Sequence, residues 1–302
     1  MISRTTCPIS GQPSEVVYRR PYTHPGVRRF LDEAGLGAKA GEVVYEIRHC
    51  TASGLFFQTW VMEDAELAGM YSSPRGVAQF EQEISQQRLH WFAHMADEVL
   101  VLRQSIKNPR PVVLDFGSNW GKWSSMALAF GCDVHAVEVN REAAAFCAAR
   151  GIKIIAREEL GEPRFDFIQV DQVLEHLTDP LGAARLLANS LKPGGLMKWG
   201  TPNAPKLPVL LAGLGNTNDG PVPDARTLDP LLPLMHVNLF SKASLTHLAT
   251  TVGLEPFRPS LGVLIGSGQM WNMPRQLNRN VVAPFKRWRL TGTELWFRRP
   301  QS

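Results

Sequence analysis

The chain has 302 residues, of which 44% are hydrophobic and 20% charged, and its formal net charge is +4. These values are typical of an ordinary soluble globular protein that is long enough to bury a core. No apolar run is long enough for a transmembrane helix, and the N-terminal sequence MISRTTCPIS lacks the apolar stretch of a signal peptide. Only 4 cysteines occur, which favours reduced thiols over a disulfide framework. We therefore expect a cytoplasmic location.

Residues 1–75 are expected to form a small separate region that contains the same short pattern twice. CPISG begins at Cys7 and CTASG begins at Cys50, so a serine (Ser10 or Ser53) and a glycine follow each cysteine at the same spacing. The pattern resembles the two C-x-x-C knuckles of a zinc ribbon, in which four thiolates bind one zinc ion. Serine replaces the second cysteine of each knuckle, and its hydroxyl is a poor zinc ligand. The resemblance therefore implies a degenerate, β-rich ribbon without metal.

Two segments connect this region to the rest of the chain. Residues 19–40, between the two knuckles, are expected to be a loop that serves as a substrate lid or a partly ordered insertion. Apolar residues at three-to-four spacing then predict a long amphipathic helix over 79–106. The helix carries a pair of histidines four residues apart, His90 and His94, which we interpret as incidental rather than as a metal pair.

From residue 112 onward, strand and helix patterns alternate. We predict strands at 112–115, 133–138, 152–155, 165–170 and 195–200, and helices at 121–130, 141–150 and 180–191. Such alternation favours a doubly wound parallel sheet with helices on both faces. Active sites in these sheets lie at the carboxyl ends of the strands.

The segment VVLDFGSNWG, which begins at Val112, carries the strongest signal. A buried strand ends in Asp115, a turn with Gly117 and Gly121 follows, and a helix comes next. A strand, a glycine turn and a helix N-terminus together present backbone N–H groups to a nucleotide-like ligand. The spacing does not match the G-x-G-x-x-G pattern of dinucleotide-binding folds, because Asn119 stands between the glycines.

Three further segments follow in order. A short strand ends in Glu138, and the sequences FDFIQVDQVLEHLTDP (165–180) and LKPGGLMKWGTPN (191–203) come later. Together with the first motif, they resemble the class I S-adenosylmethionine (SAM) methyltransferases over residues 78–265. This resemblance implies a Rossmann-like domain over 76–270 that binds SAM.

The resemblance also assigns roles to individual residues. The glycine loop would let the backbone approach the methionine part of SAM, Asp115 would order that loop, and Glu138 would hold the ribose hydroxyls. Asn tolerates left-handed backbone conformations, so the loop can keep its shape with Asn119. The expected cofactor-binding residues are Asp115, Gly117, Ser118, Asn119, Gly121, Glu138 and Gln172.

Glu175 and His176 resemble the Glu-His pair of ubiquinone-type O-methyltransferases. In that group an earlier acid completes a cluster suited to a base or a metal, whereas this chain has Gln172. We therefore expect no metal and take His176, with Glu175, as the candidate catalytic base, since histidine titrates near neutral pH. A purely structural role for His176 is the alternative. His236 is a second candidate base.

The remaining chain gives weaker signals. Residues 204–235 are rich in proline and too long for a plain connector, so we expect an active-site cover or an interface. Ser241 or Ser244 should cap a helix that runs to Thr251, and 261–268 reads as a late strand. The segment 271–302 is basic, which suggests either a solvated face or contact with a phosphate-bearing or lipid-linked substrate or a membrane surface.

We interpret the chain as an enzyme, a biosynthetic SAM-dependent methyltransferase that acts on an oxygen of a small molecule such as a sugar, a nucleotide-sugar or a secondary metabolite. One alternative is a quinone or lipid-linked acceptor at the membrane surface. Another is a non-catalytic partner protein that kept the fold. No nucleic-acid-binding module is visible. The sequence leaves the oligomeric state open.

Overall fold

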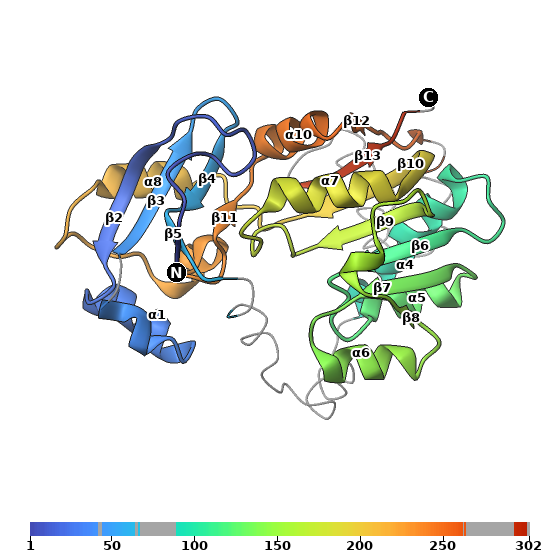
Figure 1. Cartoon of the computed structure of the whole chain (residues 1–302), viewed down its shortest axis with the longest axis horizontal. Helices are drawn as coiled ribbons and strands as arrows, with labels where there is room; N and C mark the ends of the chain where they lie inside the picture. The colour runs from blue at the N-terminus through green and yellow to red at the C-terminus, as the bar shows by residue number, and fades with distance from the viewer. Residues whose placement is uncertain (42–43, 64–65, 67–88, 262, 264–292, 301–302) are drawn as a thin grey trace. The chain divides into compact units, whose positions relative to one another are not determined.

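The computed structural model describes residues 1–41, 44–63, 66, 89–261, 263 and 293–300. The chain divides into two compact units, which are described separately. The N-terminal unit comprises Met1–Leu67, Gln172–Ala184 and Thr201–Val252. The parallel-sheet unit comprises Ala68–Asp171, Arg185–Gly200 and Gly253–Ser302. Figure 1 shows the elements of both units.

The parallel-sheet unit is built on a seven-stranded sheet of order β12-β13-β10-β9-β6-β7-β8. β10, β9, β6, β7 and β8 are parallel neighbours, and β13 is antiparallel to both β10 and β12. The strands are β6 Val112–Phe116, β7 Asp133–Val137, β8 Lys153–Ile154, β9 Phe165–Asp171, β10 Leu191–Gly200, β12 Glu255–Pro256 and β13 Glu294–Arg298. The doubly wound, mostly parallel sheet predicted from the alternating pattern is confirmed.

Helices flank this sheet (Figure 1). They are α4 Leu89–Ser105, α5 Lys122–Ala129, α6 Arg141–Ala148 and α7 Pro180–Ser190, with a 3₁₀ turn, η2, at Arg157–Glu159. The ring of Phe167 on β9 contacts the rings of both Trp123 and Trp296, with ring centroids 5.6 and 5.4 Å apart. The first part of the helix predicted over 79–106 lies outside the described residues. The predicted strand at 261–268 does so as well, apart from Leu261 and Val263.

The N-terminal unit contains a four-stranded sheet of order β11-β4-β3-β2. Its strands are antiparallel neighbours: β2 Glu15–Pro21, β3 Val44–Cys50, β4 Leu55–Gln58 and β11 Asn238–Leu239. A separate pair joins β1 Ile2–Ser3 to β5 Trp60–Val61. β11 therefore comes from a late part of the chain and pairs directly with β4.

Helices connect and cover these strands. They are α1 Pro25–Glu33, α8 Leu207–Leu214, α9 Ala225–Leu228 and α10 Lys242–Thr251, with the 3₁₀ turns η1 Gly37–Gly41 and η3 Asp229–Leu231. Ser241 accepts a hydrogen bond from the backbone N–H of Ser244 at 3.2 Å, which confirms the predicted cap of α10. The guanidinium of Arg20 is fully buried and donates to the carbonyls of Leu214, Gly215, Thr217, Gly220 and Pro221.

The structure corrects three sequence-based expectations. Residues 19–40 are not a loop, because α1 forms there and buries Val27, Phe30 and Leu31. Residues 1–75 are not a separate region, since their sheet is completed by β11. The segment 271–302 is not a separate tail, because its described part supplies β13, which lies between β10 and β12 in the sheet. In the last two cases the expected boundaries differ from the structure because strands pair with partners from distant parts of the chain.

Candidate functional site

The loop between β6 and α5 has the backbone shape that its glycines suggested. Gly117, Asn119 and Gly121 all have positive φ, at 80°, 50° and 67°. The N–H of Gly117 donates to the carbonyl of Val137 at 2.9 Å, which ties the loop to the end of β7. Asparagine is one of the few residues that adopt this conformation readily, so Asn119 keeps the turn that a glycine would otherwise provide.

Glu138 follows β7 and binds backbone groups on both sides of the site. One carboxylate oxygen accepts from the N–H of Asn119 at 2.6 Å, and the other accepts from the N–H of Asn140 at 2.8 Å. Each oxygen of a carboxylate has two lone pairs, so each can accept a further hydrogen bond. Glu138 therefore fixes the loop that carries Asn119 and retains the capacity to receive two hydroxyl groups.

Asp115 lies at the end of β6 and is 5% exposed. Its carboxylate accepts a hydrogen bond from the hydroxyl of Ser124 on α5 at 2.7 Å. Burial raises the pKa of Asp115 to about 7, and the negative charges of Asp171 and Glu138 add to this rise against the effect of the Ser124 hydrogen bond. The carboxylates near the carboxyl ends of β6, β7 and β9 thus repel one another, and a positively charged ligand would relieve this repulsion.

Asp171, the last residue of β9, was not singled out from the sequence. The residue is exposed as a whole, yet desolvation of its carboxyl by the surrounding protein raises its pKa, and the positive charge of Lys198 acts in the opposite direction. The signal was present in the motif FDFIQVDQVLEH, in which an acid stands where a predicted parallel strand ends. Perturbed acids at such positions are frequent in functional sites.

An ion-pair network lies beside Asp171. Lys198 on β10 is 2% exposed, and its ammonium group lies 2.5 Å from a carboxylate oxygen of Glu98 on α4. His94, one turn earlier on α4, approaches the same oxygen at 3.1 Å and Glu294 on β13 at 3.8 Å. His94, Glu98 and Glu294 have metal-ligand spacing. However, the ammonium group of Lys198 already neutralises Glu98, so we interpret the cluster as an ion-pair network.

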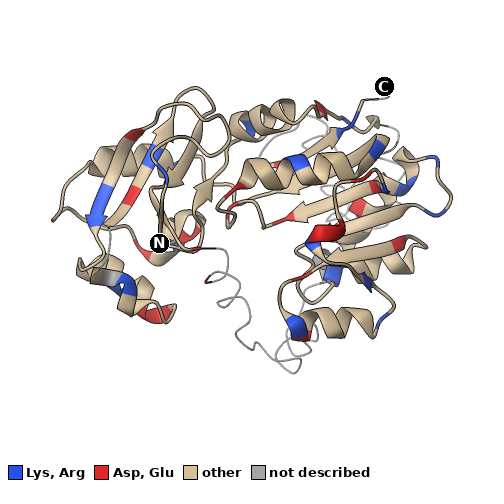
Figure 2. Cartoon of the chain, viewed as in Figure 1, with Lys and Arg blue, Asp and Glu red and all other residues tan. Residues whose placement is uncertain are grey.

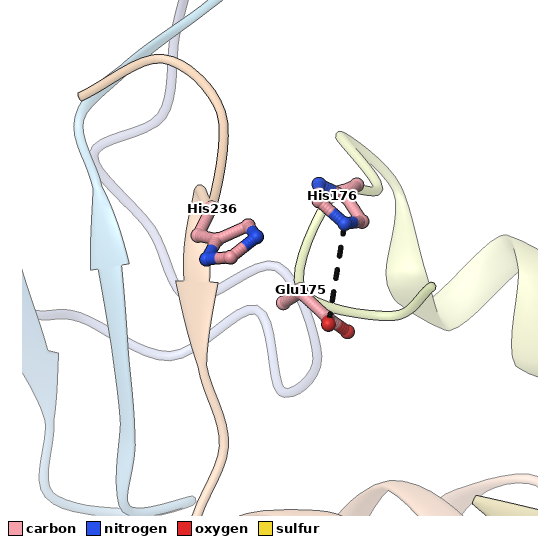
Figure 3. Close-up of side chains that lie close together, drawn as sticks. All are labelled: Glu175, His176 and His236. Carbon is pink, nitrogen blue, oxygen red and sulfur yellow. Dashed lines mark ion pairs between the residues drawn. The ribbon is translucent and has the colours of Figure 1, made fainter. Parts of the chain in front are cut away.

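The expected catalytic residues lie together in the N-terminal unit (Figure 3). Glu175 is fully buried, and one of its carboxylate oxygens lies 4.0 Å from Nε2 of His176. The rings of His176 and His236 meet edge to face, with centroids 4.6 Å apart. The structure therefore brings the adjacent residues Glu175 and His176 together with His236, which lies 60 residues after His176 in the chain.

The hydrogen bonds of the two histidines define their tautomers. Nδ1 of His176 bonds to the carbonyl of Met235 at 3.0 Å, and Nδ1 of His236 bonds to the carbonyl of Asp229. A carbonyl only accepts, so Nδ1 carries the proton in each ring and Nε2 carries the lone pair. Burial lowers the pKa of His176 to about 4, with His236 adding to the effect and the Met235 carbonyl opposing it. Burial also lowers the pKa of His236, so both rings are neutral at pH 7.

Gln172 has a left-handed backbone with φ of 55° and an exposed side chain. It belongs to the N-terminal unit, whereas the other expected cofactor residues belong to the parallel-sheet unit. Its contact with the cofactor therefore stays a prediction.

The two knuckle-like segments of the N-terminal unit meet side by side. Cys7 Sγ lies 3.2 Å from the hydroxyl of Ser53, and Cys50 Sγ lies 3.5 Å from the hydroxyl of Ser10. Burial alone would raise the pKa of Cys50, but hydrogen bonds from both serines lower it to about 7. The ligand positions of a zinc ribbon thus come together, and the loss of its metal stays a prediction.

The charged side chains of the described C-terminal residues make contacts within the parallel-sheet unit. Arg298 stacks on Phe257 at 4.4 Å, and Arg299 donates to the carbonyls of Asn189 and Leu191. The other five basic residues between 275 and 299 lie outside the described residues. Basic and acidic side chains are interspersed along the described chain (Figure 2). Among the described residues, no helix is long and apolar enough to cross a membrane.

The fold and the loop at the end of β6 define a class I methyltransferase architecture. A family model described as a methyltransferase domain matches residues 87–257, more than half of the chain. The chain therefore belongs to this methyltransferase-domain family. SAM is the methyl donor of the family, and the cofactor expected from the motifs is confirmed at that level.

Individual relatives are more distant. The ubiquinone biosynthesis O-methyltransferase of Alkalilimnicola ehrlichii is 29% identical over 114 residues, which cover 34% of this chain and 46% of that protein. The match thus spans about half of the relative. The plantazolicin methyltransferase BpumL in complex with SAH is similar with a TM-score of 0.47 and 12% identity, over 78% of this chain and 94% of that one. An O-methyltransferase family protein from Burkholderia thailandensis gives a TM-score of 0.43 and 15% identity, over 70% and 56%.

The residues present fit SAM. Gly117 and Asn119 are the exposed residues of the loop before α5, and both have positive φ. Glu138 can accept hydroxyl hydrogens, and the repelling carboxylates around Asp115 suit a ligand with positive charge. When bound, SAM supplies a methyl group on a positively charged sulfur.

Proposed function

We propose that the protein transfers a methyl group from SAM to a hydroxyl oxygen of a small molecule, with His176 as the base that removes the hydroxyl proton. The observation that carries this proposal is the pair of neutral imidazoles, each held in one tautomer by a backbone carbonyl. The segment that carries Glu175 and His176 follows β9 directly in the chain.

The three residues divide the work. Nε2 of His176 accepts the proton of the hydroxyl as the oxygen takes up the methyl group. Glu175, 4.0 Å from this nitrogen, stabilises the imidazolium that forms. His236 packs against the ring of His176 and limits its rotation. Much of the rate enhancement is expected from alignment of the acceptor, because a methyl transfer needs an in-line approach.

The low pKa of His176 bears on the acceptor. An imidazole with a pKa of about 4 is a weak base, and proton transfer is efficient when donor and acceptor are closely matched. A phenolic hydroxyl, with a pKa of about 10, is a better match than the much less acidic hydroxyl of a sugar. The similarity to a ubiquinone biosynthesis O-methyltransferase also supports a phenol or quinol. Sugars and nucleotide-sugars are therefore the second candidate acceptors.

The cofactor half of the proposal is tested by titrating SAM into the wild-type protein and Glu138→Ala in a calorimeter. We expect the substitution to weaken binding at least about tenfold, or about 1.4 kcal/mol, because it removes both the ribose partner and the anchor of Asn119. Glu142→Ala, an exposed acid in the first turn of α6, is the matched control and should bind like wild type. Absence of SAM binding by the wild type would refute the proposal.

The acceptor half is tested with catechols, hydroquinones and nucleotide-sugars, following methylated products by mass spectrometry. Phenolic substrates should turn over fastest, and His176→Gln should lower kcat by roughly a hundredfold or more while SAM affinity is kept. Turnover confined to nucleotide-sugars would favour the second candidate. Liposomes that contain a quinol test a membrane-bound acceptor, since contact through the basic segment should weaken as salt increases.

A further inference from the structure

The N-terminal unit holds the two segments that carry the histidines through one buried arginine. Arg4 is 9% exposed, and its guanidinium donates to the carbonyls of Thr178, Val237 and Gln58 at 3.2, 2.9 and 3.1 Å and to the side-chain oxygen of Asn238 at 3.0 Å. Burial lowers the pKa of Arg4 to about 10, so the group is protonated at neutral pH. Its bonds to neutral oxygens are therefore charge-assisted.

Asn238 continues the connection toward Glu175 and His176. It is fully buried on β11, and its side-chain amide donates to the carbonyls of Leu174 and Leu177 at 3.0 and 2.8 Å. Its backbone N–H donates to the carbonyl of Glu175 at 3.0 Å. These three hydrogen bonds hold the turn that carries Glu175 and His176, because their acceptors lie before, at and after that pair of residues.

Gln58, at the end of β4, holds the segment that leads to His236. Its amide donates to the carbonyls of Leu232 and His236 at 2.8 and 2.9 Å, and its oxygen accepts from the N–H of Leu234 at 2.9 Å. Leu234 has a φ of 61°, a conformation that costs free energy for a bulky residue and persists only where neighbours support it. Gln58 provides that support.

We propose that Arg4, Gln58 and Asn238 form a brace whose role is to position His176 and His236 for catalysis. The inference rests on the proposed function of His176. It also gives the N-terminal unit a role that does not depend on metal. Residues in and near β4 and β1 hold the segments that carry His176 and His236 in a fixed relative position. The three are positioning residues, since they act through the histidines.

The test uses substitutions in the full chain that change no charge. Arg4→Lys keeps the cation but loses the planar fork of donors, and Gln58→Met removes three hydrogen bonds at similar volume. Arg20→Lys is the matched control, because Arg20 is also buried and donates to backbone carbonyls of another segment, residues 214–221. All three variants should lose stability, so stability alone does not distinguish them.

The deciding readout is the pKa of each histidine, from NMR titration of imidazole resonances assigned with His176→Gln and His236→Gln. In Arg4→Lys and Gln58→Met we expect the pKa of His176 to rise by at least about one unit, because a loosened pair admits water. In Arg20→Lys it should stay at the wild-type value. With a phenolic acceptor, kcat should fall roughly tenfold to a hundredfold in the brace variants, with SAM affinity unchanged.

The outcomes separate the two proposals. The brace would be overturned if Arg4→Lys and Gln58→Met both had the same histidine pKa values and the same kcat as Arg20→Lys. If the wild type methylates no acceptor, the proposed function fails, and the NMR titration still decides whether the brace positions the histidines. If Arg4→Lys does not fold, Gln58→Met carries the test alone.

Discussion

Cys147 occupies the space that a side chain at Gly121 would need: a Cβ on Gly121 would lie 2.7 Å from the Cys147 sulfur. Gly121 also has a φ of 67°, which L-residues rarely adopt. Gly121→Ala should therefore destabilise the protein by roughly 2–4 kcal/mol, from backbone strain together with overpacking. Thermal unfolding measures the loss, and SAM affinity should fall because the loop shifts.

Gly131→Ala separates these two effects. Gly131 also has positive φ, at 80°, but a Cβ there meets nothing within 4 Å. It should cost only the strain, about 1 kcal/mol, and leave SAM binding intact. Equal losses of stability in the two variants would show that the side chain of Cys147 moves to accommodate the added methyl group.

Asp115→Asn should make the SAM-free protein more stable and the SAM complex weaker. The raised pKa of about 7 means that the folded state resists ionisation of this carboxyl, whereas the unfolded chain ionises near pH 4. The folded state therefore loses stability as the pH rises from about 4 to about 7, and asparagine avoids that loss. At pH 8 we expect a gain of up to about 4 kcal/mol, because the folded and unfolded pKa values of Asp115 differ by about 3.

Denaturant unfolding at pH 5 and pH 8, with and without SAM, checks this prediction. The gain from Asp115→Asn should be larger at pH 8, and SAM should stabilise the variant less than the wild type. A variant that is less stable at both pH values would contradict the argument. Ser124→Ala is a useful companion, since it removes the hydroxyl that favours the charged form of Asp115.

The pH dependence of methyl transfer should reflect the low pKa of His176. An ordinary histidine loses its basic form below pH 6.5, but this ring stays neutral down to a pH of about 4 because its pKa is lowered by burial. We therefore expect kcat to be insensitive to His176 protonation between pH 8 and about pH 5. An acid limb near pH 6.5 that disappears in His176→Gln would contradict this.

The pH dependence of the free energy of unfolding tests the lowered pKa of His176 independently of activity. Because the unfolded ring binds a proton below about pH 6.5 and the folded ring does not until about pH 4, stability should fall as the pH drops through this window. The contribution is on the order of 3 kcal/mol, and His236 acts in the same direction. Chemical unfolding at pH 5 and pH 7 should show a smaller difference for His176→Gln than for wild type.

The double substitution Ser10→Cys with Ser53→Cys should create a zinc site. Each serine hydroxyl already lies within 3.5 Å of a cysteine sulfur, so four thiolates would meet at spacing that suits a tetrahedral ion. We expect one zinc per chain by elemental analysis and a higher melting temperature that chelators reverse. Each single substitution is the control and should bind zinc far more weakly. A double variant without zinc would show that the knuckles do not converge.

The sequence predicted the features that depend on local residues or on periodic patterns of apolar residues. The strand from Val112 is followed by a glycine turn and a helix as expected. Asp115 lies near the end of β6, and Glu138 directly follows β7. Glu175 and His176 were predicted as a pair, but His236 was only a separate candidate, because no pattern in HVNLF indicates that it meets them. Arg4 and Gln58 gave no signal at all, since their role depends on backbone carbonyls contributed by distant segments.

The pairing of β4 with β11 has a consequence for biosynthesis. Arg4 and its partner Val237 are 233 residues apart, so the N-terminal strands leave the ribosome long before their last neighbour exists. At typical synthesis rates of about 5–20 residues per second, β4 waits roughly 10–40 s with an open hydrogen-bonding edge. During that interval the nascent chain presents an unfinished sheet, and shielding by a chaperone would favour correct closure over pairing with another chain.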